Sequence, residues 1–327
     1  MMTQYWLVGG GLILLFLGGE MLVHGAVGLS RKLGVSPLLI GLVVVGFGTS
    51  TPELMVSLDA ALQGQPDIAV GNVVGSNIAN ILLVLGIAAL IYPIHCPPKV
   101  VYRDGLAMLA ASLVLVGLGT IGKIVAWQGG LMVAVLLVFI AYSYWTEKYR
   151  MAPSAILHQH EAESIKDGTR PLWFHMIGLG VGLAAIMGGA TLLVDGAVTL
   201  ARAAGISEAV IGLTLVAIGT SLPELATSMI AAVRKQTDVA IGNILGSNMF
   251  NILSILGITA LVTPVPISPE IVDDIWIMMG VTVILLPALL TGHRLSRMEA
   301  GLFLIAYAGY IGWLYGAFPV AAVTLGL

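Results

Sequence analysis

The 327-residue sequence has very few charged residues and only one cysteine. Asp, Glu, Lys and Arg make up 9% of the chain, whereas soluble domains carry about 25%. With 58% hydrophobic residues and a mean hydropathy of +1.01, the chain is predicted to be an integral membrane protein. The single cysteine, Cys96, excludes an intrachain disulfide and a cysteine-based metal cluster. Because no Lys or Arg precedes the first apolar run, a cleaved signal peptide is not expected.

Apolar segments long enough to cross a bilayer recur along the whole chain. A spanning helix needs about 20 mostly apolar residues, and short segments with turn-forming Pro, Gly and Ser separate the candidates. The one longer polar segment covers residues 147–170. We therefore predict an all-α protein with ten transmembrane helices, at residues 5–29, 37–62, 68–92, 104–121, 124–146, 172–200, 208–233, 239–262, 271–291 and 299–318.

The two halves of the chain repeat each other. Residues 18–93 align with residues 189–264 without a gap, and 40 of the 76 positions are identical. Each half is therefore predicted to be the same five-helix unit: residues 1–146 form the first, 147–170 a linker and 171–327 the second. An odd number of helices per unit makes the second unit enter the membrane from the opposite side, an arrangement found in many secondary transporters.

The distribution of Lys and Arg predicts the orientation in the membrane. If the N-terminus lies outside, twelve of the fourteen Lys and Arg residues fall on the inner side, and only Lys123 and Arg202 fall outside. Arg31 and Arg202 are equivalent in the repeat yet fall on opposite sides, as inversion requires. The prediction is a multi-pass protein of the plasma membrane (the inner membrane of the cell), with both termini outside and the linker cytoplasmic.

One short motif occurs in both halves, as GTSTPEL from residue 48 and GTSLPEL from residue 219. Pro52 and Pro223 lack a backbone N–H, so each helix is predicted to break there and to leave carbonyl oxygens facing a cavity. A carboxylate at the bilayer centre costs about 3 kcal/mol on insertion scales. Neither segment contains a Lys or Arg to pair with Glu53 or Glu224. The two glutamates are therefore predicted either to be protonated or to hold a cation between them.

A second doubled motif follows in the next predicted helix of each half. Its polar residues are spaced i, i+4, i+8 and so share one helical face. They offer only oxygen ligands, which suit hard cations such as Ca²⁺. The residues are Asn72, Ser76 and Asn80 in the first half and Asn243, Ser247 and Asn251 in the second.

These two doubled motifs resemble the α-repeats of the cation/Ca²⁺ exchanger superfamily. The sequence is similar to prokaryotic sodium/calcium exchangers over nearly its whole length. The resemblance implies ten helices in two inverted halves, with core helices 2, 3, 7 and 8 broken, and a cluster of four cation sites. Glu53 and Glu224 would be the shared central ligands, with Thr49 and Thr220 completing the Ca²⁺ site. The other implied ligands are Ser50, Ser221, Ser76, Ser247, Asn80, Asn251 and the backbone carbonyls of Gly46 and Ala217.

The expected function is a secondary antiporter, not an enzyme, that exchanges Na⁺ for Ca²⁺ by alternating access. Many prokaryotic and potassium-dependent relatives carry Asp where this chain has Asn251, so K⁺-independent transport is expected. The resemblance implies that more than two Na⁺ move per Ca²⁺, which makes the cycle electrogenic. The expected partners are the two ions and the lipid bilayer, with no cofactor, nucleotide or nucleic acid, and no oligomeric state is predicted.

Two other functions remain open at this stage. A Ca²⁺/H⁺ antiporter, or one for another divalent cation, is the nearer alternative, because carboxylates also bind protons. The Thr-Ser pair and the Ser of the Gly-Ser-Asn motif favour Na⁺, because they supply neutral oxygens. An intramembrane hydrolase that uses Ser76 or Ser247 is the remote alternative, because the core helices contain no His or Lys to act as its base.

Overall fold

The computed structural model describes residues 2–149, 170–204 and 219–314. In this part of the chain, seven helices are long and apolar enough to cross a membrane, and one bent helix pair makes an eighth. The protein is therefore a mostly helical, multi-pass membrane protein. The predicted linker lies outside the described residues except at its two ends. The predicted seventh and tenth spans are described only from residue 219 and up to residue 314.

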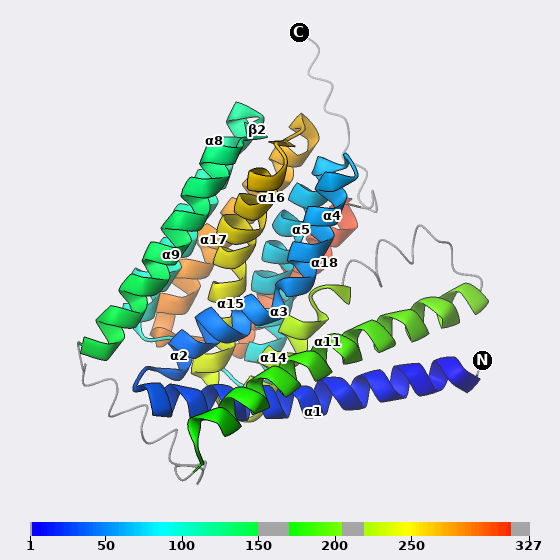
Figure 1. The fold of residues 1–327 in the computed structure, drawn as a ribbon, viewed down its shortest axis with the longest axis vertical. Coiled ribbons are helices and arrows are strands. Elements are labelled where there is room, and N and C mark those ends of the chain that lie inside the picture. The colour runs from blue at the N-terminus through cyan, green and yellow to red at the C-terminus, as the bar shows by residue number, and fades with distance from the viewer. Residues whose placement is uncertain (1, 150–169, 205–218, 315–327) are drawn as a thin grey trace.

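Figure 1 shows the helices in order along the chain. The first half contains α1 (Met2–Leu33), α2 (Pro37–Ile40), α3 (Gly46–Thr49), α4 (Thr51–Leu62), α5 (Pro66–Ala79), α6 (Leu85–Ile91), α7 (Pro98–Val100), α8 (Leu106–Ile121) and α9 (Ala126–Tyr149). The second contains α11 (Leu172–Ala203), α14 (Leu222–Val233), α15 (Thr237–Phe250), α16 (Leu256–Val262), α17 (Pro269–Leu290) and α18 (Arg297–Leu314). Short π-helical segments join several of these, at η1 (Gly41–Val45), η2 (Asn80–Val84), η3 (Val101–Gly105) and η5 (Asn251–Ile255).

The long helices α1 and α11 lie side by side and cross the other helices obliquely (Figure 1). They run antiparallel, because Gly11 faces Gly189 while Gly18 faces Gly182. A Cβ atom on Gly18 would lie 2.8 Å from the carbonyl oxygen of Gly182, so the two backbones are in direct contact. Only residues without a side chain allow helices to approach this closely.

The first-half motif forms a bend between two helices. Helix α3 ends at Thr49, α4 begins at Thr51, and the segments on either side are bent by 43°. Ser50 between them has φ −85° and ψ 10°, outside the helical range. Pro52 has no N–H to donate to the carbonyl of Gly48, which accounts for the interruption at this position. The corresponding segment before Gly219 lies outside the described residues.

The expected breaks in the third and eighth helices are not present. Pro66–Ile91 and Thr237–Val262 each run as one continuous helix. Each contains a five-residue π-helical turn, which begins at Asn80 in the first and at Asn251 in the second. Neither helix has a proline beyond its first residue, so no later residue lacks the backbone N–H that a continuous helix needs. The prediction of broken helices was wrong for these two, and the irregularity is a π-turn, a feature frequent at functional sites.

Four two-residue strands join the two halves in antiparallel pairs. Strand β1 (Ile94–His95) pairs with β4 (Arg294–Leu295), and β2 (Lys123–Ile124) pairs with β3 (Val265–Pro266). The sequence offset of 171 that relates the two halves carries β1 onto β3 and β2 onto β4. The two pairs are therefore equivalent in the repeat, and each links a loop of one half to a loop of the other.

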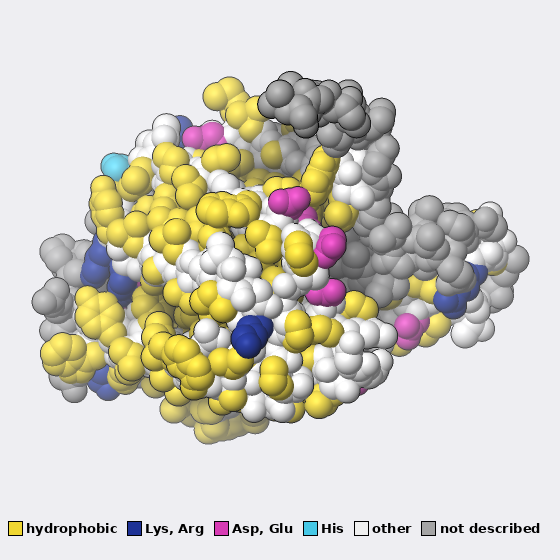
Figure 2. Space-filling model, turned by 90° about the horizontal axis from the view of Figure 1, so that it is seen from above, with side chains coloured by type: hydrophobic (Ala, Val, Ile, Leu, Met, Phe, Trp, Pro, Cys, Tyr) yellow, Lys and Arg dark blue, Asp and Glu magenta, His cyan; other side chains and the backbone are white. Residues whose placement is uncertain are grey.

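The outer surface is largely apolar, as a bilayer requires. Large hydrophobic side chains such as Leu137, Val138 and Ile305 are exposed along the helices. Figure 2 looks along the longest axis, onto the upper end of the molecule in Figure 1, where charged side chains lie among hydrophobic ones.

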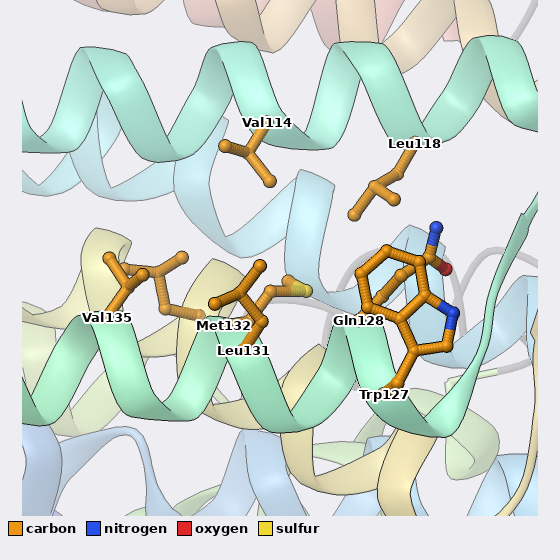
Figure 3. Close-up of a pocket in the computed structure, with 8 residues that line it drawn as sticks. Val114, Leu118, Trp127, Gln128, Leu131, Met132 and Val135 are labelled. Carbon is orange, nitrogen blue, oxygen red and sulfur yellow. The ribbon is translucent and has the colours of Figure 1, made fainter.

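A shallow apolar hollow lies between α8 and α9, lined by residues that include Val114, Leu118, Trp127 and Leu131 (Figure 3). Val114, Trp127 and Leu131 are exposed on the outside of the bundle, so the hollow faces lipid. Among the described residues, Gln128 is the one polar residue in its lining, and the amide oxygen of Gln128 already accepts from the backbone N–H of Val125, so the hollow carries no charged group for a cation.

Candidate cation-binding site

Glu53 and Glu224 are buried at equivalent places near the start of two helices. Each lies in the first turn, Glu53 on α4 and Glu224 on α14, directly after the proline. Their exposed fractions are 1% and 0%. The N-terminal end of a helix carries a partial positive charge and favours a carboxylate. The proline that interrupts the helix therefore also creates the local field that stabilises a buried negative charge.

Side chains of the first-half motif reach across to the second half. The Ser50 hydroxyl donates a 2.8 Å hydrogen bond to Oε1 of Glu224. The Thr49 hydroxyl lies 3.2 Å from Oδ1 of Asn243 on α15. Ser247, also on α15, donates to the carbonyl oxygen of Gly46 at 3.1 Å. The first-half motif and helices α14 and α15 of the second half therefore form one shared site.

The close approach at Gly46 depends on its missing side chain. A Cβ atom at this position would lie 2.8 Å from the backbone nitrogen of Ser247 and 3.0 Å from the carbonyl oxygen of Asn243. Real Cβ atoms do not approach backbone this closely, so any side chain here would push α15 away. Gly46 therefore sets the distance between the first-half motif and α15, and its carbonyl oxygen is kept within reach of Ser247.

Two asparagines, one in each half, hydrogen-bond to the helices that carry the glutamates. Asn72 donates from Nδ2 to the backbone carbonyl of Glu53 at 3.1 Å and to the Ser57 hydroxyl at 2.9 Å. Asn243 repeats the arrangement, with contacts of 3.4 Å to the carbonyl of Glu224 and 2.9 Å to the Ser228 hydroxyl. These amides contact the backbone of each glutamate and not its carboxylate. They therefore fix the backbone position from which each glutamate side chain extends.

Four buried oxygens of the doubled motifs have no hydrogen-bond partner within the described residues. An unpaired buried acceptor costs about 1–3 kcal/mol, so four of them are unfavourable unless something binds there. They belong to elements that touch across the halves, because α4 contacts η5 and α14 contacts η2. They also form two repeat-equivalent pairs of acceptors. The atoms are Oε2 of Glu53, Oε2 of Glu224, Oδ1 of Asn80 and Oδ1 of Asn251.

This donor set fits a hard cation. Among the residues that the structure describes, no cluster of three or more His, Cys, Asp or Glu could hold a metal ion. Two carboxylates must therefore be completed by neutral oxygens. Ca²⁺ takes 6–8 oxygen ligands. The Ser50 hydroxyl contacts the carboxylate of Glu224. The Thr49 and Ser247 hydroxyls lie at the carbonyl oxygen of Gly46.

Three further predicted residues lie on or just before helices that carry the site. Ser76 on α5 and Ser221 are buried, at 6% and 4% exposure, and Thr220 is half-buried and precedes α14. Ala217 lies outside the described residues. Two residues that hydrogen-bond to the predicted ligands Asn251 and Asn80 were not predicted, Asn77 and Asn248, although both belong to the doubled Gly-Ser-Asn motif. Both halves have Asn at this repeat-equivalent position, and that signal could have pointed to them.

Three further polar residues, Glu20 and His24 on α1 and Asp195 on α11, make no hydrogen bond or ion pair with Glu53 or Glu224 within the part of the chain that the structure describes. Glu20 on α1 forms an ion pair with Arg234, at the end of α14. His24 donates a 2.8 Å hydrogen bond from Nδ1 to the backbone carbonyl of Glu20, one turn earlier. Asp195 is exposed on α11. Their contacts place none of them among the candidate ligands.

The chain matches a known family over both halves. The family model described as "Sodium/calcium exchanger protein" matches residues 3–145 and 174–316. The inner membrane protein YrbG of Escherichia coli is 40% identical over 308 residues, which cover 93% of each chain. The sodium/calcium exchanger MaX1 of Methanosarcina acetivorans is 31% identical, over 93% of this chain and 96% of MaX1.

A solved structure has the same fold. The sodium-calcium exchanger NCX_Mj, soaked with 10 mM Na⁺ and no Ca²⁺, superposes with a TM-score of 0.82 at 30% sequence identity. The match covers 95% of this chain and 98% of that one. The similarity therefore extends over the whole architecture and is not confined to the motifs.

Proposed function

The chain belongs to the sodium/calcium exchanger family, and we propose that it exchanges Na⁺ for Ca²⁺ across the membrane by alternating access. As a member of this family it is a transporter and not an enzyme. The observation that carries the proposal is the set of four unpartnered oxygens on Glu53, Glu224, Asn80 and Asn251. Two ionised glutamates supply a charge of −2, which one Ca²⁺ balances. Na⁺ competes for the same oxygens, so both ions are not held fully at once.

We propose the following roles for the ligands. Glu53 and Glu224 bind Ca²⁺ together with Thr49 and Thr220. Na⁺ ions bind on either side of this centre and use hydroxyl and carbonyl oxygens. Asn80 and Asn251 line the middle of the cation cluster, between the flanking Na⁺ ions. The flanking Na⁺ ligands are Ser50, Ser221, Ser76, Ser247, Gly46 and Ala217.

The proposed architecture has ten spans in two inverted halves, residues 1–146 and 171–327, joined by a cytoplasmic linker at 147–170. Two observations support the inversion: the repeat-equivalent helices α1 and α11 run antiparallel, and the strand pairs β1–β4 and β2–β3 are equivalent in the repeat. The charge distribution supports termini on the outside and a location in the plasma membrane.

We propose that α1 and α11 move as a pair against the remaining helices and expose the site to each side in turn. A site with bound cations is close to neutral, so the apolar helices α1 and α11 can slide past it. An empty site carries two uncompensated carboxylates and opposes the movement. Transport is K⁺-independent, because Asn251 adds no third carboxylate, and electrogenic if more than two Na⁺ move per Ca²⁺.

The test is uptake of radioactive Ca²⁺ into proteoliposomes loaded with Na⁺. We expect uptake that requires the outward Na⁺ gradient, is unchanged by K⁺, and increases when the vesicle interior is made positive. Glu53→Gln and Glu224→Gln should each abolish it. Asp59→Asn is the matched control, because Asp59 is an exposed carboxylate on the same helix as Glu53.

The same vesicles separate Na⁺ coupling from H⁺ coupling. If a pH gradient drives Ca²⁺ uptake in the absence of Na⁺, the Ca²⁺/H⁺ antiporter is the correct function. Undiminished Na⁺-driven uptake by Glu53→Gln and Glu224→Gln would exclude the proposed site altogether.

A further inference from the structure

We propose that Asn77 and Asn248 are positioning residues that turn the amide oxygens of Asn251 and Asn80 toward the bound cation. The inference rests on the proposed cation site and assigns a role to two residues that are not among its ligands. Both are buried, with exposed fractions of 1%. Each belongs to one half of the chain and acts on a ligand of the other half.

The hydrogen bonds form a crossed pair. Asn251 donates from Nδ2 to Oδ1 of Asn77 at 3.0 Å. Asn80 donates from Nδ2 to Oδ1 of Asn248 at 3.1 Å. The amide nitrogens of Asn251 and Asn80 are thus both engaged as hydrogen-bond donors. In each, the amide oxygen is the atom that has no partner within the described residues.

This arrangement matters because an asparagine side chain has two chemically opposite ends. The carboxamide offers an oxygen acceptor at one end and an NH₂ donor at the other, and the two are nearly equal in size. Packing alone cannot select between them. If the amide of Asn251 rotated by 180°, an NH₂ group would face the cation and one ligand would be lost. A dedicated acceptor for the NH₂ group removes this ambiguity.

The acceptors are themselves fixed in one orientation. Asn77 donates from Nδ2 to the backbone carbonyl of Asn248 at 3.3 Å and to the sulfur of Met278 at 3.6 Å. Asn248 donates from Nδ2 to the sulfur of Met108 at 3.6 Å. Rotation of Asn77 would lose these bonds and place its NH₂ against the NH₂ of Asn251. The orientation is thus set by a chain of bonds that ends at two buried thioethers.

The thioethers serve this purpose better than a stronger acceptor would. Met108 on α8 and Met278 on α17 are both fully buried, and sulfur accepts hydrogen bonds weakly. A carboxylate in either place would bring a further negative charge close to the two glutamates. Methionine gives each NH₂ group a direction without adding charge, so the central charge stays at −2.

A purely structural role predicts different behaviour from a positioning role. If Asn77 only fills space in the core, its replacement lowers stability and leaves ion affinity unchanged in the protein that remains folded. If Asn77 positions Asn251, replacement lowers affinity, and the effect depends on the chemistry of residue 251. A carboxylate at 251 presents an oxygen in either orientation and needs no such control.

The experiment measures the Ca²⁺ concentration for half-maximal uptake in the full-length protein for a set of variants. Asn77→Leu keeps the size of the side chain and removes the acceptor. We expect it to raise this concentration about 10- to 100-fold, the usual effect of removing a partner that orients a metal ligand. In the Asn251→Asp background, Asn77→Leu should change it less than about threefold, because either carboxylate oxygen can face the ion.

The Asn248–Asn80 pair allows the same experiment to be done independently. Asn248→Leu should weaken binding by a similar factor, and its effect should disappear in the Asn80→Asp background. If either leucine variant fails to fold, the other still decides the question. An unchanged half-maximal concentration in a folded leucine variant, or the same increase with and without the aspartate, would overturn the proposal. Absence of Ca²⁺ uptake by the wild-type protein would instead count against the proposed function.

Discussion

Arg234 donates two hydrogen bonds to the carboxylate of Glu20, from Nε at 2.8 Å and from Nη2 at 2.7 Å. The pair joins the end of α14 to α1, one of the two helices that we propose to move. Hydrogen bonding to Glu20 and the negative charge of Glu20 raise the pKa of Arg234, so the guanidinium stays protonated. The equivalent positions of the other half hold Gln63 and Thr191, which are uncharged. The ion pair therefore stabilises only one of the two symmetry-related contacts.

Removing this ion pair should accelerate transport. The Arg234 side chain is 50% exposed and that of Glu20 15%, and an ion pair at a surface contributes about 1 kcal/mol, which corresponds to about a fivefold change in rate. We expect Glu20→Gln and Arg234→Gln each to raise the maximal rate of Ca²⁺ uptake by up to this factor, without changing the half-maximal Ca²⁺ concentration. The double variant should be no faster than either single variant, because both remove the same interaction. Multiplying effects would mean that the two residues act separately.

The contact between α1 and α11 should not tolerate a methyl group at its glycines. A Cβ atom on Gly182 would lie 2.6 Å from the backbone nitrogen of Leu22 and 2.8 Å from the carbonyl oxygen of Gly18. Gly182→Ala must push the helices apart, and overpacking of this kind costs about 1–3 kcal/mol. We expect a lower thermal midpoint in detergent and a severe loss of transport.

Gly180→Ala is the control for this prediction. Gly180 lies on the same helix, and a Cβ atom there would meet no described atom within 4 Å. Alanine also has the higher helix propensity. This variant should transport normally and melt no earlier than the wild type. Equal loss of transport in both variants would show that helix flexibility, and not the close contact, is what these glycines provide.

Much of the fold and the site could be predicted from the sequence because the gene encodes the unit twice. The repeat identified Glu53 and Glu224 as a pair, and the apolar surroundings indicated that they are buried. The bend between α3 and α4 follows from the covalent chemistry of Pro52. Such local constraints can be recognised without knowledge of tertiary contacts.

The features that could not be predicted are those set by tertiary contacts. No local rule distinguishes a π-turn from a break, so the continuous helices at Asn80 and Asn251 were expected to be interrupted. The pairing of Glu20 with Arg234 joins residues 214 positions apart and has no counterpart in the other half. The role of Asn77 depends on which way an amide faces, and sequence spacing carries no information on that orientation.

Removing the ions should destabilise the protein through the site. Two buried carboxylates without a counter-ion are unfavourable, and a ligand at 1,000 times its Kd stabilises the folded state by about 4 kcal/mol. We expect the thermal midpoint to fall when Ca²⁺ is chelated in a Na⁺-free buffer and to recover when Ca²⁺ is added. Glu224→Gln should melt at the same temperature with and without Ca²⁺. A Ca²⁺-dependent shift of wild-type size in that variant would place the stabilising ion elsewhere.

Cysteine labelling can test the orientation, because the native thiol should be unreactive. Cys96 is fully buried, and burial raises the pKa of its thiol to about 12. The reactive thiolate is then about one part in 10,000 at pH 8, whereas an ordinary thiol of pKa about 8.5 is about a quarter ionised. The wild-type protein should therefore remain unlabelled by maleimide in intact vesicles and become labelled only after denaturation.

On this unreactive background, two exposed residues form a matched pair. Lys123 on β2 and Arg294 on β4 are equivalent in the repeat, and both are exposed. Inverted halves place them on opposite sides of the membrane, with Lys123 outside. In right-side-out vesicles, a membrane-impermeant maleimide should label Lys123→Cys and not Arg294→Cys, and inside-out vesicles should give the reverse. Labelling of both from one side would exclude the inverted arrangement, while a consistent exchange of the two sides would keep the inversion and reverse the predicted orientation.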